Sequence, residues 1–337
     1  MTLGHWKTLS ECQKLTQSQL IPGVVEEDIK RNGLLDRIAV AQAKGKSIKW
    51  NREKVTLESA VAGANIGDQL AWTSDVEYDA MEVELKRLYI QRVLDKFVPD
   101  VYGTINNYEA QVLWEMKKGI VRKINDALLY NDIDYGSAFD FDGIHAWAAV
   151  QTGTDLDIDE GNGALSLANL RTMSDAMKHG IDFYYFPYVI ARRLDEAYQE
   201  GGFTLASTFT MGRISYGIDE AGRRIMFWDG VPILRTDYLV GEGADTGKGS
   251  NLRTKTGSTY YSIFALKMGD VFNGEPGLTL GFGNTEMVGQ FYKIELFDKL
   301  EDYDAGGMRL VSYLALLLGS KMALGRIIDI TDASITA

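Results

Sequence analysis

A glycine-rich segment, GEGADTGKGS over residues 241–250, has the composition of a phosphate-binding loop. Such a loop needs a glycine at its first position and a serine or threonine directly after the lysine, because backbone N–H groups and a hydroxyl contact the nucleotide and its magnesium. Here Glu242 stands at the position of the first glycine, and Gly249 follows Lys248. We therefore expect a mobile polar surface loop at this place and no bound phosphate.

Three aspartates, Asp155, Asp157 and Asp159, have the spacing with which a calcium-binding loop begins. The rest of the pattern fails, since Glu160 occupies the position of the turn glycine and Ser166 that of the bidentate glutamate. We interpret the segment as a solvated acidic turn, with a weak surface cation site as the alternative.

The other reactive side chains are isolated from one another along the chain. His5, His145 and His179 lie in different segments, and none has a partner at the spacing of a helix or hairpin metal site. A single cysteine, Cys12, excludes an intrachain disulfide framework and a zinc site with several cysteines. The sequence has no Gly-x-Ser-x-Gly nucleophile elbow. We expect no catalytic residue, no cofactor and no bound metal, and therefore no enzyme.

Composition and charge describe an ordinary folded chain. The 337 residues are 45% hydrophobic and 24% charged, as in typical globular proteins. A formal net charge of -12 disfavours a sequence-independent nucleic-acid binder, because phosphate contacts need clustered lysine and arginine. No secretory signal and no apolar stretch of membrane-spanning length occur, so we expect an intracellular chain without membrane contact.

Two stretches near the N-terminus have too few apolar residues to form a core. Residues 1–43 are polar and segmented, and we interpret them as an extended arm that lies on the body or on a neighbour, with a flexible terminus as the alternative. Residues 44–75 have a basic stem and a tip of small residues around Gly63 and Gly67. We predict a long β-hairpin whose function is to reach a partner.

A long amphipathic helix is the clearest element of the sequence. Met116, Ile120 and Ile124 recur at a spacing of four, with charged residues between them. This period places them on one face of a helix. The pattern predicts a helix over residues 106–130, which Asn106 or its neighbour would cap.

Shorter elements follow along the chain. Helices are predicted over 166–179, with His179 near the dipole at its end, and over 187–200, where two glycines after residue 200 would stop it. Strand patterns occupy 223–228, 231–238, 259–267, 289–297 and 308–317. A helix-rich middle and a strand-rich end indicate the α+β class.

Six phrases in a fixed order resemble the major capsid protein family of tailed bacteriophages, whose fold is the Hong Kong ninety-seven type. GVVEEDIKRNGLLDRIAV, residues 23–40, is similar to the end of that family's arm, and KWNREKVTLESA, residues 49–60, to the start of its extended loop. The other four are FDFDGIHAW at 139–147, GNGALSLANLRTMSDAM at 161–177, GRRIMFWDGVPILRTDYL at 222–239 and GSTYYSIFALKMGD at 257–270. The resemblance extends from Gly23 to about residue 330.

The resemblance implies a division of the chain into four parts. These are an N-terminal arm over 1–43, an extended loop over 44–75, a peripheral domain over 76–145 and 288–322 with the long helix as its spine, and an axial domain over 146–287 and 323–337.

The function that the resemblance implies is structural. The chain would be a major capsid protein that assembles into hexamers and pentamers of an icosahedral phage head around double-stranded DNA, without binding a particular DNA sequence. Its expected partners are further copies of itself, a separate scaffolding protein, a portal and, in some members, a decoration protein. Some family members begin with a long cleavable scaffolding region, for which this chain has no room before Gly23, so a separate scaffolding protein or prior trimming is implied, and Met1 at the start favours the separate protein. The expected location is the virion, after assembly in the host cytoplasm.

Arg52, Glu53 and Lys54 of the extended loop are the candidate contacts between subunits. The alternative is that they only keep the hairpin soluble, since exposed ion pairs contribute ~0–1 kcal/mol each. Some family members cross-link neighbouring subunits through a lysine of this loop and an asparagine of a late turn. The corresponding turn here, residues 298–307, has no asparagine, so we expect no such cross-link.

Two other functions stay open at the level of sequence. One is a bacterial encapsulin-type compartment, whose shell shares the fold but encloses cargo enzymes. The other is a soluble enzyme that acts on phosphorylated substrates through the segment that begins at Gly241, in which case replacing Lys248 would abolish nucleotide binding.

Overall fold

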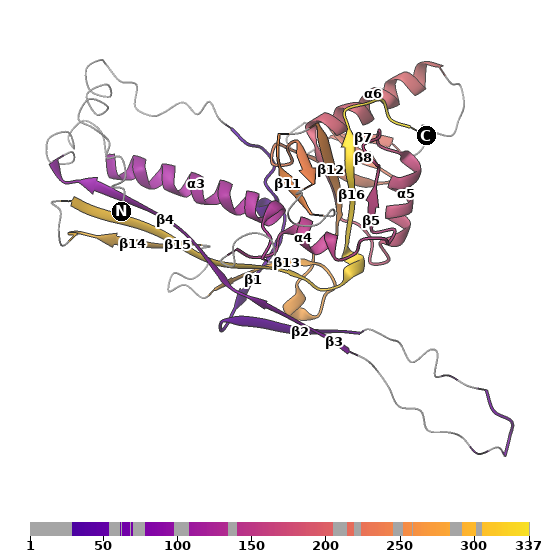
Figure 1. Ribbon diagram of the computed structural model, residues 1–337, viewed down its shortest axis with the longest axis horizontal. Coiled ribbons are helices and arrows are strands. Elements are labelled where there is room, and N and C mark those ends of the chain that lie inside the picture. Colours follow the sequence, from indigo (N-terminus) through magenta and orange to yellow (C-terminus); the bar gives the residue numbers. More distant parts are fainter. Residues whose placement is uncertain are drawn as a thin grey trace.

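The structure is a computed structural model of the chain. It describes residues 29–53, 61, 63–67, 69, 78–97, 108–133, 140–204, 214–218, 224–244, 252–257, 259–283, 292–300 and 305–336. Within these residues, two large sheets and four α-helices form two adjoining parts, from which a hairpin projects (Figure 1). The class is α+β, which confirms the prediction from sequence.

A five-stranded sheet forms the elongated part of the molecule (Figure 1). Its strands are β1 (Ala39–Ala43), β13 (Leu278–Gly283), β15 (Ala305–Leu318), β14 (Lys293–Phe297) and β4 (Lys86–Asp95). The long strand β15 is central, because β13, β14 and β4 all pair with it in antiparallel register. Its last five residues are almost completely buried, so this end of the sheet lies in the core.

The long helix α3 (Tyr108–Tyr130) runs along this sheet (Figure 1). Met116, Ile120 and Ile124 are at most 4% exposed and belong to the same apolar cluster as β15, as the periodicity predicts. The predicted cap, Asn106 or the next residue, lies outside the described residues. Within the described part of the chain, no helix is long and apolar enough to cross a membrane.

A nine-stranded mixed sheet forms the other part. Its strands are β5 (Asp157–Asp159), β6 (Phe183–Pro187), β7 (Ile214–Ile218), β8 (Arg224–Trp228), β9 (Val231–Thr236), β10 (Glu242–Ala244), β11 (Arg253–Lys255), β12 (Tyr260–Leu266) and β16 (Leu324–Thr331). Three 3-10 turns complete the described elements: η1 (Leu34–Asp36), η3 (Val271–Asn273) and η4 (Lys321–Ala323).

The central strand β12 shows how both faces of this sheet are covered. Ile263 and Ala265 pack in the cluster of α5 (Leu167–Ala176) and α6 (Tyr188–Thr204). Phe264 and Leu266 pack in the cluster that contains α3 and α4 (Ile144–Ala149). Successive side chains of a strand point to opposite faces, so burial on both faces requires the continuous apolar run that β12 has.

Two helix predictions need correction. Helix α6 continues through Gly201 and Gly202 to Thr204, since glycine weakens a helix by about 1 kcal/mol relative to alanine without preventing helical backbone. Helix α5 ends at Ala176, so His179 is not at its C-terminus as predicted, and His179 Nε2 lies 3.1 Å from Ser320 Oγ.

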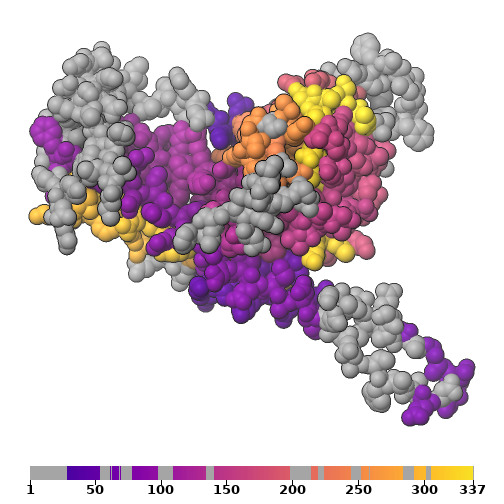
Figure 2. Space-filling model, in the orientation of Figure 1, coloured from indigo at the N-terminus to yellow at the C-terminus, as the bar shows by residue number. Residues whose placement is uncertain are grey.

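The predicted hairpin has its paired base in β2 (Ser47–Glu53) and β3 (Tyr78–Glu84), which form a separate two-stranded antiparallel sheet. The register joins Ser47 to Glu84 and Glu53 to Tyr78, so the pairing extends beyond residue 75. Figure 1 shows the segment around residue 65 far from both large sheets, and in Figure 2 the same tip stands apart from the main body.

The division into arm, loop, peripheral and axial parts stays a prediction. Strand β13, which the predicted boundaries place in the axial part, pairs with β15 of the peripheral part, and β1 of the arm pairs with β13. Residues 39–43 and 278–283 therefore lie in the same sheet as the strands of the predicted peripheral domain.

Candidate assembly surface and buried polar network

The two predicted contact residues of the extended loop that the structure describes, Arg52 and Glu53, lie in different environments. Arg52 shares the body-facing side of the β2–β3 hairpin with Ile48 and Trp50, of which Ile48 is buried. Glu53 is exposed on the opposite side, next to Tyr78 on the partner strand. Lys54 lies outside the described residues. A role of these residues between subunits stays a prediction, but Arg52 already has partners in its own chain.

Arg52 fastens the base of the hairpin to the body. Its Nε donates to the carbonyl oxygen of Gly319 at 2.9 Å, and a second guanidinium nitrogen donates to the carbonyl oxygen of Leu318. The guanidinium carbon lies 5.7 Å from the ring centroid of Trp50 and 5.6 Å from that of Trp147. Burial lowers the pKa of Arg52, although a guanidinium stays charged at any physiological pH. The hairpin, α4 and the end of β15 therefore meet at one side chain.

The turn that receives Arg52 connects the two large sheets. It follows β15 of the five-stranded sheet and leads through η4 into β16 of the nine-stranded sheet. The backbone N–H of Gly319 donates to Gly277 O at 3.0 Å, and that of Ser320 donates to Pro276 O at 2.9 Å. Through its bonds to this turn, Arg52 connects the hairpin to the link between the two large sheets.

The face of the five-stranded sheet that points away from α3 carries exposed aromatic side chains. Ile90 of β4 points toward Gly119 of α3, whereas the preceding Tyr89 is 59% exposed and Tyr313 of β15 is 39% exposed. A shallow pocket on this face is lined by Arg87, Tyr89, Gln91, Glu295, Arg309, Val311 and Tyr313. Tyrosine and arginine are enriched at protein interfaces, so this face could receive another protein surface.

A second cluster of polar residues is buried where α3 and α4 meet the nine-stranded sheet. Glu242 is 1% exposed and lies at the start of β10. In the sequence it stood out only because it replaces the first glycine of a phosphate-binding loop. Tyr130 donates its hydroxyl to Glu242 Oε1 at 2.7 Å, and Ser262 donates to Oε2. Burial alone would raise the pKa of Glu242, but His145, Ser262 and Tyr130 hold it below its usual value. The prediction of a surface loop is therefore wrong for this residue.

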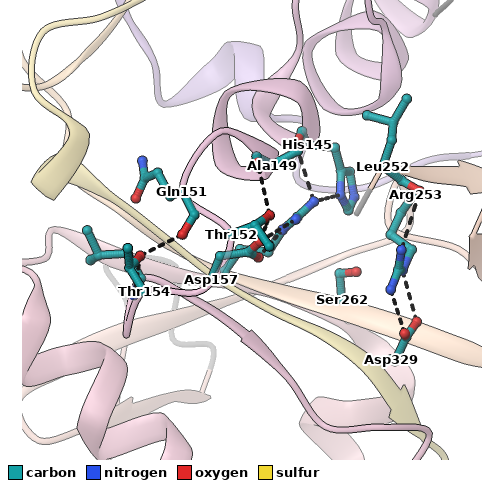
Figure 3. Close-up of polar contacts among 12 residues, drawn as sticks. His145, Ala149, Gln151, Thr152, Thr154, Asp157, Leu252, Arg253, Ser262 and Asp329 are labelled. Atoms are coloured by element: carbon teal, nitrogen blue, oxygen red, sulfur yellow. Dashed lines mark hydrogen bonds and ion pairs between the residues drawn. The ribbon is translucent and has the colours of Figure 1, made fainter. Parts of the chain in front are cut away.

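Arg326 continues the network on the other side of His145. It has no exposed side-chain surface and binds Asp157 through Nε at 2.7 Å and Nη2 at 2.8 Å. Its Nη1 lies 3.2 Å from Nδ1 of His145 and donates to the carbonyl oxygen of the same residue at 3.2 Å (Figure 3). The interpretation of Asp157 as part of a solvated turn is wrong, because its carboxylate neutralises a buried guanidinium.

His145 is completely buried between aromatic rings. Its ring stacks on Tyr130 at a centroid distance of 5.1 Å and meets Phe264 edge-on at 4.8 Å. Burial lowers the pKa of His145, nearby Arg326 and Arg253 add to the shift, and Glu242 opposes it. Among the described residues, no group of three or more histidine, cysteine or carboxylate side chains could hold a metal.

Comparison of the sequence with protein-family models and with curated proteins finds no match. The structure, in contrast, is similar to solved shell proteins. It aligns with the SrpI encapsulin of Synechococcus elongatus PCC 7942 at a TM-score of 0.66 and 12% identity, covering 99% of both chains. It aligns with the capsid structure of Cyanophage P-SCSP1u at 0.56 and 13% identity, covering 93% of both chains. For the capsid of a native GTA particle, the TM-score is 0.56 and the identity 11%, covering 98% of this chain and 100% of the other.

At sequence identities of 11–13%, the structural similarity shows which fold the chain has. It covers between 93% and 99% of this chain in the three alignments. The chain therefore has the Hong Kong ninety-seven fold, which phage capsids and encapsulin shells share.

Proposed function

We propose that the chain is a structural protein that builds a closed shell from copies of itself, and that it is not an enzyme. The projecting hairpin is the observation that carries this proposal. Its strands pair with no other described strand, and Val61 and Ile66 near its tip are 82% and 108% exposed. An isolated two-stranded hairpin is at best marginally stable in water. A partner that covers the tip would remove this apolar surface from water.

A second copy of the chain supplies such a partner. Head-to-tail contacts between identical subunits generate a ring when the rotation between them closes. A closed shell forms when each ring also contacts the rings around it. The hairpin of one copy would lie on its neighbour, and the exposed face of the five-stranded sheet with Tyr89 and Tyr313 is the candidate receiving surface. Glu53 and Lys54 would then meet the neighbour, whereas Arg52 holds the hairpin at the required angle.

The finer form of the proposal is a phage head. Hexamers and pentamers would enclose double-stranded DNA in an icosahedral virion, assembled in the host cytoplasm with a separate scaffolding protein, a portal and, where present, a decoration protein. The likeness to the capsids of a cyanophage and of a GTA particle supports this form. An encapsulin-type compartment is the second candidate, because the alignment with the SrpI shell has the higher TM-score of 0.66.

The alternative of an enzyme that acts on phosphorylated substrates depended on a phosphate-binding loop that begins at Gly241. Glu242 begins a strand and its carboxylate is enclosed by protein groups, so the start of the candidate phosphate loop is part of the core. Lys248 lies outside the described residues.

Electron microscopy of the purified protein, together with size-exclusion chromatography, tests the proposal. We expect closed shells, tubes or rings for the native chain and for Ile66→Val, which keeps an apolar tip. Ile66→Asp should remain a small species with an unchanged unfolding midpoint, because the residue is exposed in the single chain. A native protein that stays monomeric at every concentration, or an Ile66→Asp variant that assembles normally, would contradict the proposal. DNA inside shells from the natural source would favour the phage head, and a protein cargo the compartment.

A further inference from the structure

The buried network forms one continuous path of contacts. It leads from Asp157 through Arg326 and His145 to Glu242, where Tyr130 and Ser262 donate their hydroxyl hydrogens. The path joins helices α3 and α4 to strands β5, β10, β12 and β16 of the nine-stranded sheet. A fully buried titratable side chain, His145, stands in the middle of this path.

The contacts define the protonation state of His145. A guanidinium has no acceptor, so Nδ1 of His145 at 3.2 Å from Arg326 Nη1 must accept the hydrogen bond. The proton of the neutral ring then sits on Nε2, which lies 3.4 Å from Glu242 Oε1. His145 is therefore the only neutral link between a buried cation and a buried anion in this path.

A second proton would break this arrangement. It would place a hydrogen on Nδ1 against a guanidinium that Asp157 holds at 2.7 and 2.8 Å, so Arg326 has little freedom to withdraw. The imidazolium would have to move, and its ring is packed between Tyr130 and Phe264. Movement of the ring would disturb the stacking on α3 and the contact with β10 together.

We propose that His145 is a proton-operated link, which holds α3 and α4 against the nine-stranded sheet when neutral and loosens them when protonated. The groups that act on it come from every neighbouring element: Tyr130 from α3, Glu242 from β10, Arg253 from β11, Ser262 from β12, and Arg326 from β16 with its partner Asp157 from β5. Only Glu242 favours the charged ring, whereas burial and the two arginines oppose it. The proposal concerns a single copy of the chain and does not depend on the shell.

The sign of the pH dependence follows from the direction of the shift. The pKa of His145 in the folded protein is below its usual value of 6.5, so the unfolded or opened chain binds the proton first. The stabilisation is fully present above that value and is lost as the pH falls from there through the pKa of the folded state. The pKa of Glu242 is also lowered, from 4.5, so its own contribution is lost only in more acidic solution.

Hydrogen exchange of the unassembled protein, corrected for the intrinsic pH dependence of exchange, measures the link directly. Between about pH 7.5 and about pH 5.5, we expect the protection of residues 144–149 to fall about tenfold in the native chain. His145→Gln, whose amide oxygen can accept from Arg326 and whose amide N–H can point toward Glu242, should show a constant protection. His179→Gln, a replacement of an exposed histidine, should behave as the native chain does.

Two results would overturn the proposal. One is an equal loss of protection in His145→Gln and in the native chain, or no loss in either. The other comes from ring-nitrogen NMR of the native protein, which needs no variant to fold: a neutral ring with its proton on Nδ1, or an ordinary histidine titration, is incompatible with the link. The expected spectrum shows the Nε2–H tautomer at neutral pH.

Discussion

Arg52→Met would release the base of the hairpin while keeping most of the apolar stem of the side chain. The substitution removes the hydrogen bonds to Leu318 O and Gly319 O and both contacts with the rings of Trp50 and Trp147. The two carbonyl groups can bind water instead, and the hydrophobic contacts of Ile48 remain. We therefore expect the chain to fold and the hairpin to detach more often.

The size of the effect can be estimated from these contacts. A hydrogen bond to a charged group contributes ~1.5–3 kcal/mol, and a partly desolvated cation–π contact ~1 kcal/mol. Because Arg52 is half-buried, part of this sum is offset by the cost of removing its charge from water. A net loss of ~2 kcal/mol in the docking free energy of the hairpin corresponds to about 30-fold faster hydrogen exchange through the opened state.

Hydrogen exchange at residues 47–53 and 78–84 of the unassembled protein is the assay. Lys49→Met is the matched control, since Lys49 pairs with Glu82 at 2.9 Å on the exposed side of the same hairpin. Such a surface pair contributes little, so exchange should change less than about threefold. If Arg52→Met raises exchange no more than Lys49→Met does, Arg52 does not fasten the hairpin. Arg52→Lys should resemble the methionine variant, because an ammonium cannot match the two carbonyls and two rings together.

Three further outcomes are expected. Gly143→Ala should lower the free energy of unfolding in urea by ~1–3 kcal/mol, because the added Cβ would lie 2.8 Å from Ala127 O of α3, and an unchanged midpoint would show that α4 can shift away. Asp157→Asn should cost ~3–5 kcal/mol in the same measurement by leaving Arg326 uncompensated, and a much smaller loss would mean that water reaches the guanidinium. Tyr313→Glu should leave unfolding unchanged but prevent assembly seen by size-exclusion chromatography, and normal shells would exclude this sheet face as the receiving surface.

The pattern of residue types in the sequence was sufficient for the elements with a regular period. The spacing of Met116, Ile120 and Ile124 predicts helix α3, and the absence of a core in residues 44–75 predicts the projecting hairpin. The order of weak phrases implied the fold that the structural comparison confirms. Strand β6 was not predicted, because a short run that is buried on both faces has no alternation to reveal it.

Only the tertiary structure decided what the charged residues do. Arg52 reads as a solvent-facing charge in the sequence, yet it binds carbonyl groups 266 and 267 positions away. Asp157 and Glu242 look like parts of incomplete binding motifs in the sequence. In the structure, Asp157 neutralises Arg326, 169 positions away, and Glu242 accepts a hydrogen bond from Tyr130, 112 positions away. Periodicity shows which side of an element is buried, because that information lies within one element. A buried charge network forms only where segments that are distant in sequence meet, so no pattern within one segment can predict it.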